Sequence, residues 1–297
     1  MRLFYRQAGS GPPVLLPNGM HLLRDFRPLA AARSLIFYDA RNRGRSDPVA
    51  DAARLARGIW HDVTDLDAVR RHFGIERLDA IGHSYSGWML ALYAREHPER
   101  VNRLVQIGPM QPNAASQYPP HLANVDATAA SVFGQLARMA QTRPPAGPVS
   151  QEDCETLWSV LRPIFVINRA DAGKIDWGRC ELPNERDFMR YWLGILLPSI
   201  QSVRFSPADL ARVHAPVLVV HGTLDRNSPY GAGREWAMLL PNAGLVTVPG
   251  AAHAPWVEAP DLVLGAIGAF LDGRWPEAAE KVTSIDPAGM GRLRELG

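Results

Sequence analysis

A run of apolar residues leads directly into the motif GHSYSG at positions 82–87, and a helical pattern follows the motif at once. The run Leu78–Ile81 is short and continuous, which predicts a buried strand. The stretch Trp88–Glu96 predicts a helix that ends before Pro98. A chain that passes from strand to helix through a serine must turn very sharply, and small neighbouring residues let the two elements pack closely. This feature favours a sheet with helices packed against it.

The same alternation of short apolar runs and amphipathic stretches continues along most of the chain. It predicts an α/β fold, a mostly parallel sheet covered by helices on both faces. The other expected strands are Leu3–Gln7, Val14–Leu16, Ser34–Tyr38, Val101–Ile107, Val217–His221 and Leu245–Val248. The other expected helices include Trp60–Phe73, a helix around Arg234–Leu240 and Pro260–Leu271. A tight Gly/Pro connection joins the first two runs, which predicts an antiparallel hairpin at the start.

The alternation is interrupted between residues 111 and 212, where no clear strand is found and prolines cluster. We interpret residues 111–212 as a helical lid, or cap, inserted into a core formed by residues 1–110 and 213–297. The tail beyond Trp275 shows no strong pattern. Within the lid, five apolar residues recur at helical spacing and share one face: Phe188, Tyr191, Trp192, Ile195 and Leu196. That face either packs within the lid or roofs a pocket.

Composition and charge exclude several classes of protein. The 297 residues are 46% hydrophobic and 21% charged, as in an ordinary globular protein. A net charge of +2, spread along the chain, does not indicate binding to nucleic acid or a membrane surface. No apolar stretch reaches the roughly 18 residues that a membrane span needs. We therefore expect a small-molecule substrate and neither nucleic acid nor membrane as a partner, and no pattern indicates the oligomeric state.

The two cysteines, Cys154 and Cys180, are too few for a disulfide framework and too isolated for a zinc site. The first residues lack the apolar stretch and cleavage site of a secretory signal. We therefore expect two free thiols, no bound metal and a cytoplasmic location.

The motif at 82–87 makes Ser84 the candidate nucleophile. A serine hydroxyl is a weak nucleophile and needs a base within hydrogen-bond reach. Among nine histidines, His253 lies in a loop of small residues directly after the last expected strand. In a sheet of this kind, ligands bind outside the carboxyl ends of the strands, so this loop is where a base belongs. His83 and His221 are near the candidate residues in sequence, but we expect both to be structural.

Two further groups complete the candidate site. Asp225 lies just past the carboxyl end of the strand Val217–His221, at the same edge as His253, and we expect it to orient that histidine. Acyl transfer also needs hydrogen-bond donors for a developing oxyanion. The backbone N–H of Tyr85 lies at a helix start, where negative charge is favoured. We expect the second donor to be the backbone N–H of Met20, with Gly19 as the less favoured choice.

Several segments together resemble the α/β-hydrolase superfamily: residues 17–19, 38–47, 82–87, 97–101, the loop of Asp225 and residues 253–258. The resemblance extends from about residue 2 to residue 272, excepting the lid. The position of the lid is similar to that in proline iminopeptidases and related esterases. The resemblance implies an eight-stranded sheet, no cofactor, and a catalytic triad in the chain order Ser84, Asp225, His253.

The sequence departs from the pattern of the superfamily at three points. Asn18 stands where a histidine usually precedes the oxyanion glycine, and Asn42 stands where a glycine is usual. We expect these two changes to alter the shape of the pocket without abolishing the chemistry. The third departure is the motif GHSYSG itself, where iminopeptidases typically show GGSWGS. It weakens the specific resemblance to iminopeptidases.

The leading hypothesis is therefore a carboxylesterase-like serine hydrolase that acts on an ester or similar acyl compound. One alternative is an aminopeptidase that removes N-terminal proline, and another is a ligand-binding receptor with slow turnover; lyase and cofactor-free peroxidase activities also occur on this fold. An iminopeptidase needs a carboxylate beside the protonated amine of its substrate. Glu181 and Glu185 are the candidates for that role, unless they only mark a solvated helix start. Trp192 is the candidate contact for an apolar substrate group.

Overall fold

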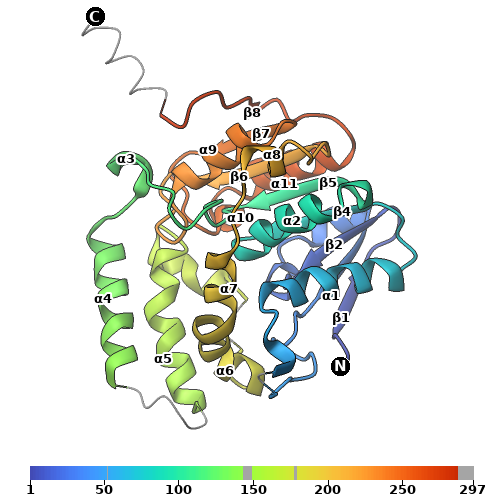
Figure 1. Ribbon diagram of the computed structural model, residues 1–297. Coiled ribbons are helices and arrows are strands. Elements are labelled where there is room, and N and C mark those ends of the chain that lie inside the picture. Colours follow the sequence, from blue (N-terminus) through green and yellow to red (C-terminus); the bar gives the residue numbers. More distant parts are fainter. Residues whose placement is uncertain (52, 143–148, 177–178, 287–297) are drawn as a thin grey trace, which may run out of the picture.

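The computed structural model describes residues 1–51, 53–142, 149–176 and 179–286. One eight-stranded sheet has the order β1-β3-β2-β4-β5-β6-β7-β8 (Figure 1). Its strands are β1 (Tyr5–Ala8), β2 (Pro13–Pro17), β3 (Ser34–Tyr38), β4 (Leu78–His83), β5 (Val101–Ile107), β6 (Val217–Gly222), β7 (Ala243–Val248) and β8 (Ala279–Glu280). The two edge strands, β1 and β8, are antiparallel to their neighbours, and the other pairs are parallel. The α/β class is confirmed.

The predicted hairpin between the first two strands is wrong. β1 pairs with β3, and β2 lies on the other side of β3. The connection from β1 to β2 therefore crosses the beginning of β3. Gly9 and Gly11, with φ of 77° and 110°, let the chain pass very close to the backbone there, since a Cβ on Gly9 would lie 2.2 Å from the carbonyl oxygen of Ala30. The glycines serve this crossing rather than a two-strand turn.

Helices cover both faces of the sheet. The helices α1 (Ile59–His72), α2 (Tyr85–Glu96) and α9 (Tyr230–Leu239) belong to the apolar core on one face, and α11 (Pro260–Leu271) belongs to the core on the other. Because the central strands are buried on both faces, they are apolar throughout rather than alternating. The short helix α10 (Pro255–Glu258) follows β7. The strand β8 lies in the tail that showed no pattern, and residues 287–297 lie outside the described residues.

Between β5 and β6 the described residues contain helices and no strand. These helices are α3 (Pro120–Ala123), α4 (Ala127–Thr142), α5 (Gln151–Leu161), α6 (Pro183–Tyr191), α7 (Leu197–Ser202) and α8 (Pro207–Leu210). Figure 1 shows α4, α5, α6 and α7 gathered on one side of the molecule, away from the strands.

A π-helical turn, η7 (Trp192–Leu196), joins α6 to α7 and divides the apolar face that we expected on this helix. Phe188 and Trp192 line a cavity, whereas Tyr191 and Leu196 are buried in the core. A π turn inserts one residue into the helical repeat, so side chains on either side of it no longer share one face. Phe188 and Trp192 thus agree with the pocket interpretation, whereas Tyr191 and Leu196 pack in an apolar cluster shared with α1 and α2 rather than only within the inserted segment.

The cysteines are not free, contrary to our expectation. Cys154 in α5 and Cys180, just before α6, form a disulfide with Cα atoms 5.7 Å apart. The two residues are 26 positions apart, and the fold of the helical segment that brings them together is not visible in a local pattern. A disulfide is unusual in a reducing cytoplasm, so the two cysteines give no support to the expected cytoplasmic location. In the described part of the chain, every helix is too short or too polar to cross a membrane.

Candidate active site

Ser84 lies in a strained turn between β4 and α2. Its φ of 57° and ψ of −124° are left-handed values that cost a non-glycine residue about 1–3 kcal/mol. The turn is so tight that a Cβ on Gly82 would lie 2.6 Å from the backbone nitrogen of Gly87. The position that requires glycine for this close approach is therefore Gly82, whereas the side chain of Ser86 fits in the buried interior. This explains why the elbow tolerates serine at position 86.

His253 and Asp225 are in direct contact, in the loops that follow β7 and β6. Nδ1 of His253 lies 2.7 Å from Oδ2 of Asp225, and neither side chain has exposed surface. Oδ1 of Asp225 accepts hydrogen bonds from the backbone N–H groups of Asn227 and Ser228, both at 2.8 Å. Burial alone would raise the pKa of Asp225, but the charge of His253 and hydrogen bonds from His221 and His253 lower it to about 2. Asp225 is therefore a fixed, ionised acceptor.

Nε2 of His253 has no hydrogen-bond partner among the described residues, so it is not bonded to Ser84 here. Such bonds are often long or absent without a substrate. Gly108, directly after β5, was not recognised in the sequence as part of this site. A Cβ at Gly108 would lie 3.0 Å from Nδ1 of His253 and 3.1 Å from Oδ2 of Asp225. Its positive φ of 49° also favours glycine, and a glycine that ends a buried strand was the available signal.

Two backbone N–H groups are available beside Ser84. Among the described residues, neither Met20 nor Tyr85 donates its N–H to a backbone carbonyl. The N–H of Gly19 is used, because it donates to the carbonyl of Leu16 at 3.1 Å. Met20 and Tyr85 both line the same cavity as Ser84. Of the donors we considered, the geometry therefore favours Met20 and Tyr85 over Gly19.

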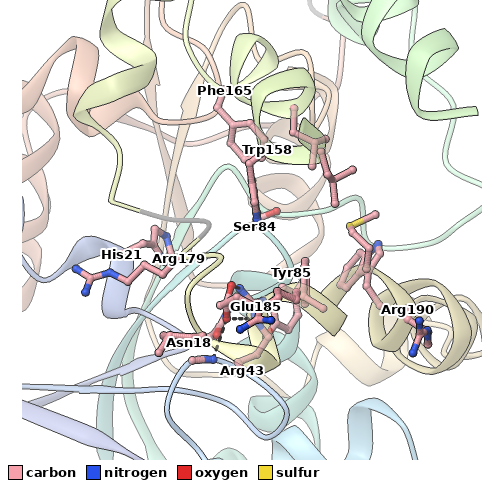
Figure 2. A pocket seen from close by; sticks show the side chains of 18 of the residues that line it. Asn18, His21, Arg43, Ser84, Tyr85, Trp158, Phe165, Arg179, Glu185 and Arg190 are labelled. Carbon is pink, nitrogen blue, oxygen red and sulfur yellow. Dashed lines mark hydrogen bonds and ion pairs between the residues drawn. The ribbon is translucent and has the colours of Figure 1, made fainter. Parts of the chain in front are cut away.

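The cavity above Ser84 has a volume of about 740 Å³. Residues of the core and of the helical segment line it together, and most of the segment's contribution is apolar, including Phe133, Leu136, Leu157, Trp158, Phe165 and Trp192. In Figure 2, Ser84 lies between Phe165 and Trp158 on one side and Tyr85, Arg43 and Glu185 on the other. The volume is that of a small-molecule site. No cluster of side chains suited to a metal ion is found in the described part of the chain.

Glu185 lines the cavity, but its charge is already neutralised by Arg43. Its Oε1 and Oε2 accept hydrogen bonds from Arg43 at 3.0 and 3.2 Å, and Oε1 also accepts from the backbone N–H of Gly44 at 2.8 Å. Burial alone would raise the pKa of Glu185, but the charge of Arg43 holds it below its ordinary value. The Arg43 guanidinium also lies over the ring of Phe188, 3.7 Å from its centroid. Glu181, in contrast, is exposed and does not line the cavity.

Two histidines that we had not assigned to the site, His21 and His83, also line the cavity. Nε2 of His21 lies 3.2 Å from Nδ1 of His83. On the far side of its ring, Nε2 of His83 lies 3.0 Å from the backbone carbonyl oxygen of His253. His221 is buried, and its Nε2 lies 3.1 Å from Oδ2 of Asp225. Sequence spacing gave no signal for the contact between His21 and His83, which are 62 positions apart.

An elbow serine, a buried histidine–carboxylate pair and an adjoining cavity define the hydrolase class of this fold. The chain belongs to the alpha/beta hydrolase fold family, which matches residues 16–260. It is 25% identical to a non-heme haloperoxidase of Rhodococcus erythropolis over 91% of this chain and 96% of that one. It is 26% identical to a pimeloyl-[acyl-carrier protein] methyl ester esterase of Chromobacterium violaceum, over 87% and 93% of the two chains. The crystal structure of the serine hydrolase CCSP0084 from Cycloclasticus zankles superposes with a TM-score of 0.68 at 18% identity, over 91% and 94% of the chains.

Proposed function

We propose that this protein is a serine hydrolase that cleaves esters of apolar acyl groups, with Ser84 as nucleophile, His253 as base and Asp225 as the residue that orients the base. The observation that carries the proposal is the buried His253–Asp225 contact of 2.7 Å, in loops at the same sheet edge as the strained Ser84. The esterase relative from Chromobacterium violaceum supports the same reaction type.

The proposed reaction follows from these positions. Ser84 attacks the ester carbonyl carbon while His253 takes its proton at Nε2, and Asp225 stabilises the resulting imidazolium. The N–H groups of Met20 and Tyr85 donate to the developing oxyanion. When the tetrahedral intermediate collapses, the bond to the alcohol breaks and His253 protonates the alcohol. Water then attacks the acyl-enzyme in the same way and releases the acid.

The helical segment between β5 and β6 acts in this proposal as the lid. It supplies most of the apolar lining of the cavity, so it receives the acyl group. Trp192 packs edge-on against Tyr85 with ring centroids 5.4 Å apart, which places the lid beside a proposed oxyanion donor. Substrate choice is then determined mainly by lid side chains.

The state of the two candidate glutamates favours the ester hypothesis over the iminopeptidase hypothesis. The cavity is also lined by Asp39, which accepts from the backbone N–H of Arg45, and by Asp176, which pairs with Arg179. A protonated substrate amine needs an uncompensated carboxylate in the pocket. Glu185 is committed to Arg43, and Glu181 is exposed outside the cavity. A substrate amine would have to break the ion pair between Arg43 and Glu185 and leave a buried guanidinium without a partner, which costs several kcal/mol.

The test compares p-nitrophenyl esters with proline p-nitroanilide, using kcat/KM. We expect many turnovers on the esters and weaker or no release from the anilide. A preference for the anilide that collapses in Glu185→Gln, but not in the matched exposed variant Glu181→Gln, would reverse the ranking. A stoichiometric burst with no further turnover would instead support a receptor on this fold.

A further inference from the structure

His83 occupies the point where three loops of the candidate site meet. It is the last residue of β4, directly before Ser84, and its side chain is 6% exposed. His21 lies on one side of its ring, in the 3-10 turn η1 (Met20–Leu22). The backbone of His253 lies on the other side. Each neighbour belongs to a loop that carries one proposed function: the oxyanion donor Met20 or the base His253.

The direction of the two hydrogen bonds follows from the chemistry of the groups. A carbonyl oxygen only accepts, so Nε2 of His83 carries the proton that is donated to the carbonyl of His253, at 3.0 Å. Burial lowers the pKa of His83 well below 6.5, and burial followed by the charge of Arg43 lowers the pKa of His21 to about 4. Both rings are therefore neutral at pH 7. Nδ1 of a neutral His83 is then an acceptor, and Nε2 of His21 donates to it across 3.2 Å.

Contacts between aromatic rings also hold His83 against its neighbours. The ring centroid of His83 lies 4.5 Å from that of His253 and 4.7 Å from that of Trp256, which meets it edge-on. Nε1 of Trp256 donates to Oδ2 of Asp25 at 3.2 Å, so Trp256 is itself anchored to the chain that follows η1. A sideways movement of the His253 loop or of η1 would therefore disturb His83 as well.

We propose that His83 is a positioning residue that fixes the base loop and the oxyanion loop relative to Ser84, through its hydrogen bonds to the His253 carbonyl and to His21. This proposal rests on the proposed function of Ser84, His253 and Met20. His83 takes no proton from the substrate, and it acts only through its two neighbours.

The central experiment compares His83→Leu with His83→Gln. A leucine fills the space but makes neither hydrogen bond, whereas a glutamine amide can donate to the His253 carbonyl and accept from His21. Because a displacement of about 1 Å can cost about 100-fold in rate, we expect His83→Leu to lower kcat on p-nitrophenyl esters by about 10- to 100-fold, with KM changed less than about threefold. We expect His83→Gln to keep kcat within about fivefold of the wild type. The matched control is His214→Leu, at an exposed histidine outside the cavity, which leaves both constants unchanged.

A double-variant cycle with His21→Leu tests the link to the oxyanion loop. If His83 acts partly through His21, the two substitutions are not additive, and His21→Leu costs less in the His83→Leu background than alone. Circular dichroism and thermal unfolding identify any variant that fails to fold, and the glutamine variant then decides the question. The proposal is overturned if folded His83→Leu keeps wild-type kcat, if His83→Gln is no better than His83→Leu, or if the cycle is additive. Wild-type protein that neither hydrolyses esters nor reacts with a fluorophosphonate at Ser84 would instead contradict the proposed function itself.

Discussion

Nδ1 of His253 and Oδ2 of Asp225 are 2.7 Å apart and completely buried, although 28 positions separate the two residues in sequence. The loops after β6 and β7 bring them together, because parallel neighbouring strands end at the same sheet edge. Gly108, directly after β5, completes the arrangement, because a Cβ there would crowd both partners at 3.0 and 3.1 Å.

Replacing Asp225 by asparagine tests the orienting role. The amide oxygen would keep the hydrogen bonds from the backbone N–H groups of Asn227 and Ser228, so the NH2 group would face Nδ1 of His253 as a donor. The imidazole would then adopt the wrong tautomer, and we expect kcat to fall on the order of 10⁴-fold. The lost charge-assisted hydrogen bonds should also lower the free energy of unfolding by about 1–3 kcal/mol. Steady-state kinetics and urea unfolding measure the two effects. A folded variant with wild-type kcat would mean that another carboxylate orients the base.

The half-buried His21 predicts a loss of stability in mild acid. The pKa of His21 is about 4 in the folded protein, lowered by burial and by the charge of Arg43 from an ordinary value of 6.5. Between these two values the unfolded chain binds a proton that the folded protein does not, so this contribution to stability is complete above pH 6.5 and is lost as the pH falls towards 4. Urea unfolding at pH 7 and pH 4.5 should show a smaller pH dependence in His21→Gln than in the wild type. An unchanged dependence would contradict the assignment.

Asp62 predicts a pH dependence of stability with the opposite sign, over a similar pH range. Both of its carboxylate oxygens are buried and have no hydrogen-bond partner in the part of the chain that the structure describes, and burial, with Asp65 nearby, raises its pKa to about 7. The folded protein therefore keeps a proton that the unfolded chain releases above pH 4, and stability falls as the pH rises towards 7. At pH 8 we expect Asp62→Asn to stabilise the protein by about 1–3 kcal/mol, and at pH 4 to change little. Equal effects at both pH values would show that burial of the charge is not the cause.

Phe133 tests the proposed acyl site in the lid. It lies on α4, lines the cavity and is 48% exposed, so its truncation should affect substrate binding more than folding. Because each buried methylene contributes up to about 0.8 kcal/mol, we expect kcat/KM to rise from acetate to octanoate esters, and Phe133→Ala to reduce that rise. Val125→Ala is the matched control, since Val125 is 78% exposed and does not line the cavity. A rise that is equally steep in all three proteins would place the acyl group elsewhere.

The parts of the site that lie at or directly after the ends of the strands could be predicted from the sequence. The strand before Ser84, the helix after it and the loops of Asp225 and His253 all have local signatures, namely continuous apolar runs, small residues and a carboxylate just past a strand end. The edge strand β1 was paired incorrectly because the same glycines suit a turn and a close crossing.

Contacts that depend on how the helical segment between β5 and β6 folds could not be predicted. The disulfide of Cys154 and the ion pair of Glu185 with Arg43 join segments that no periodicity brings together. The π turn at Trp192 also has no signal in a pattern that assumes 3.6 residues per turn. The contact of His21 with His83 depends on the exact course of a short loop after β2.

The most direct test of the central claim is covalent labelling with a fluorophosphonate probe, followed by peptide mapping. We expect a single labelled residue, Ser84, and a loss of about 10⁶-fold in kcat on p-nitrophenyl esters in Ser84→Ala, as for other triad serines. Ser86→Ala serves as the neighbouring control and should keep both labelling and activity. Labelling at Ser86, or a Ser84→Ala protein that still turns over esters at the wild-type rate, would contradict the central claim.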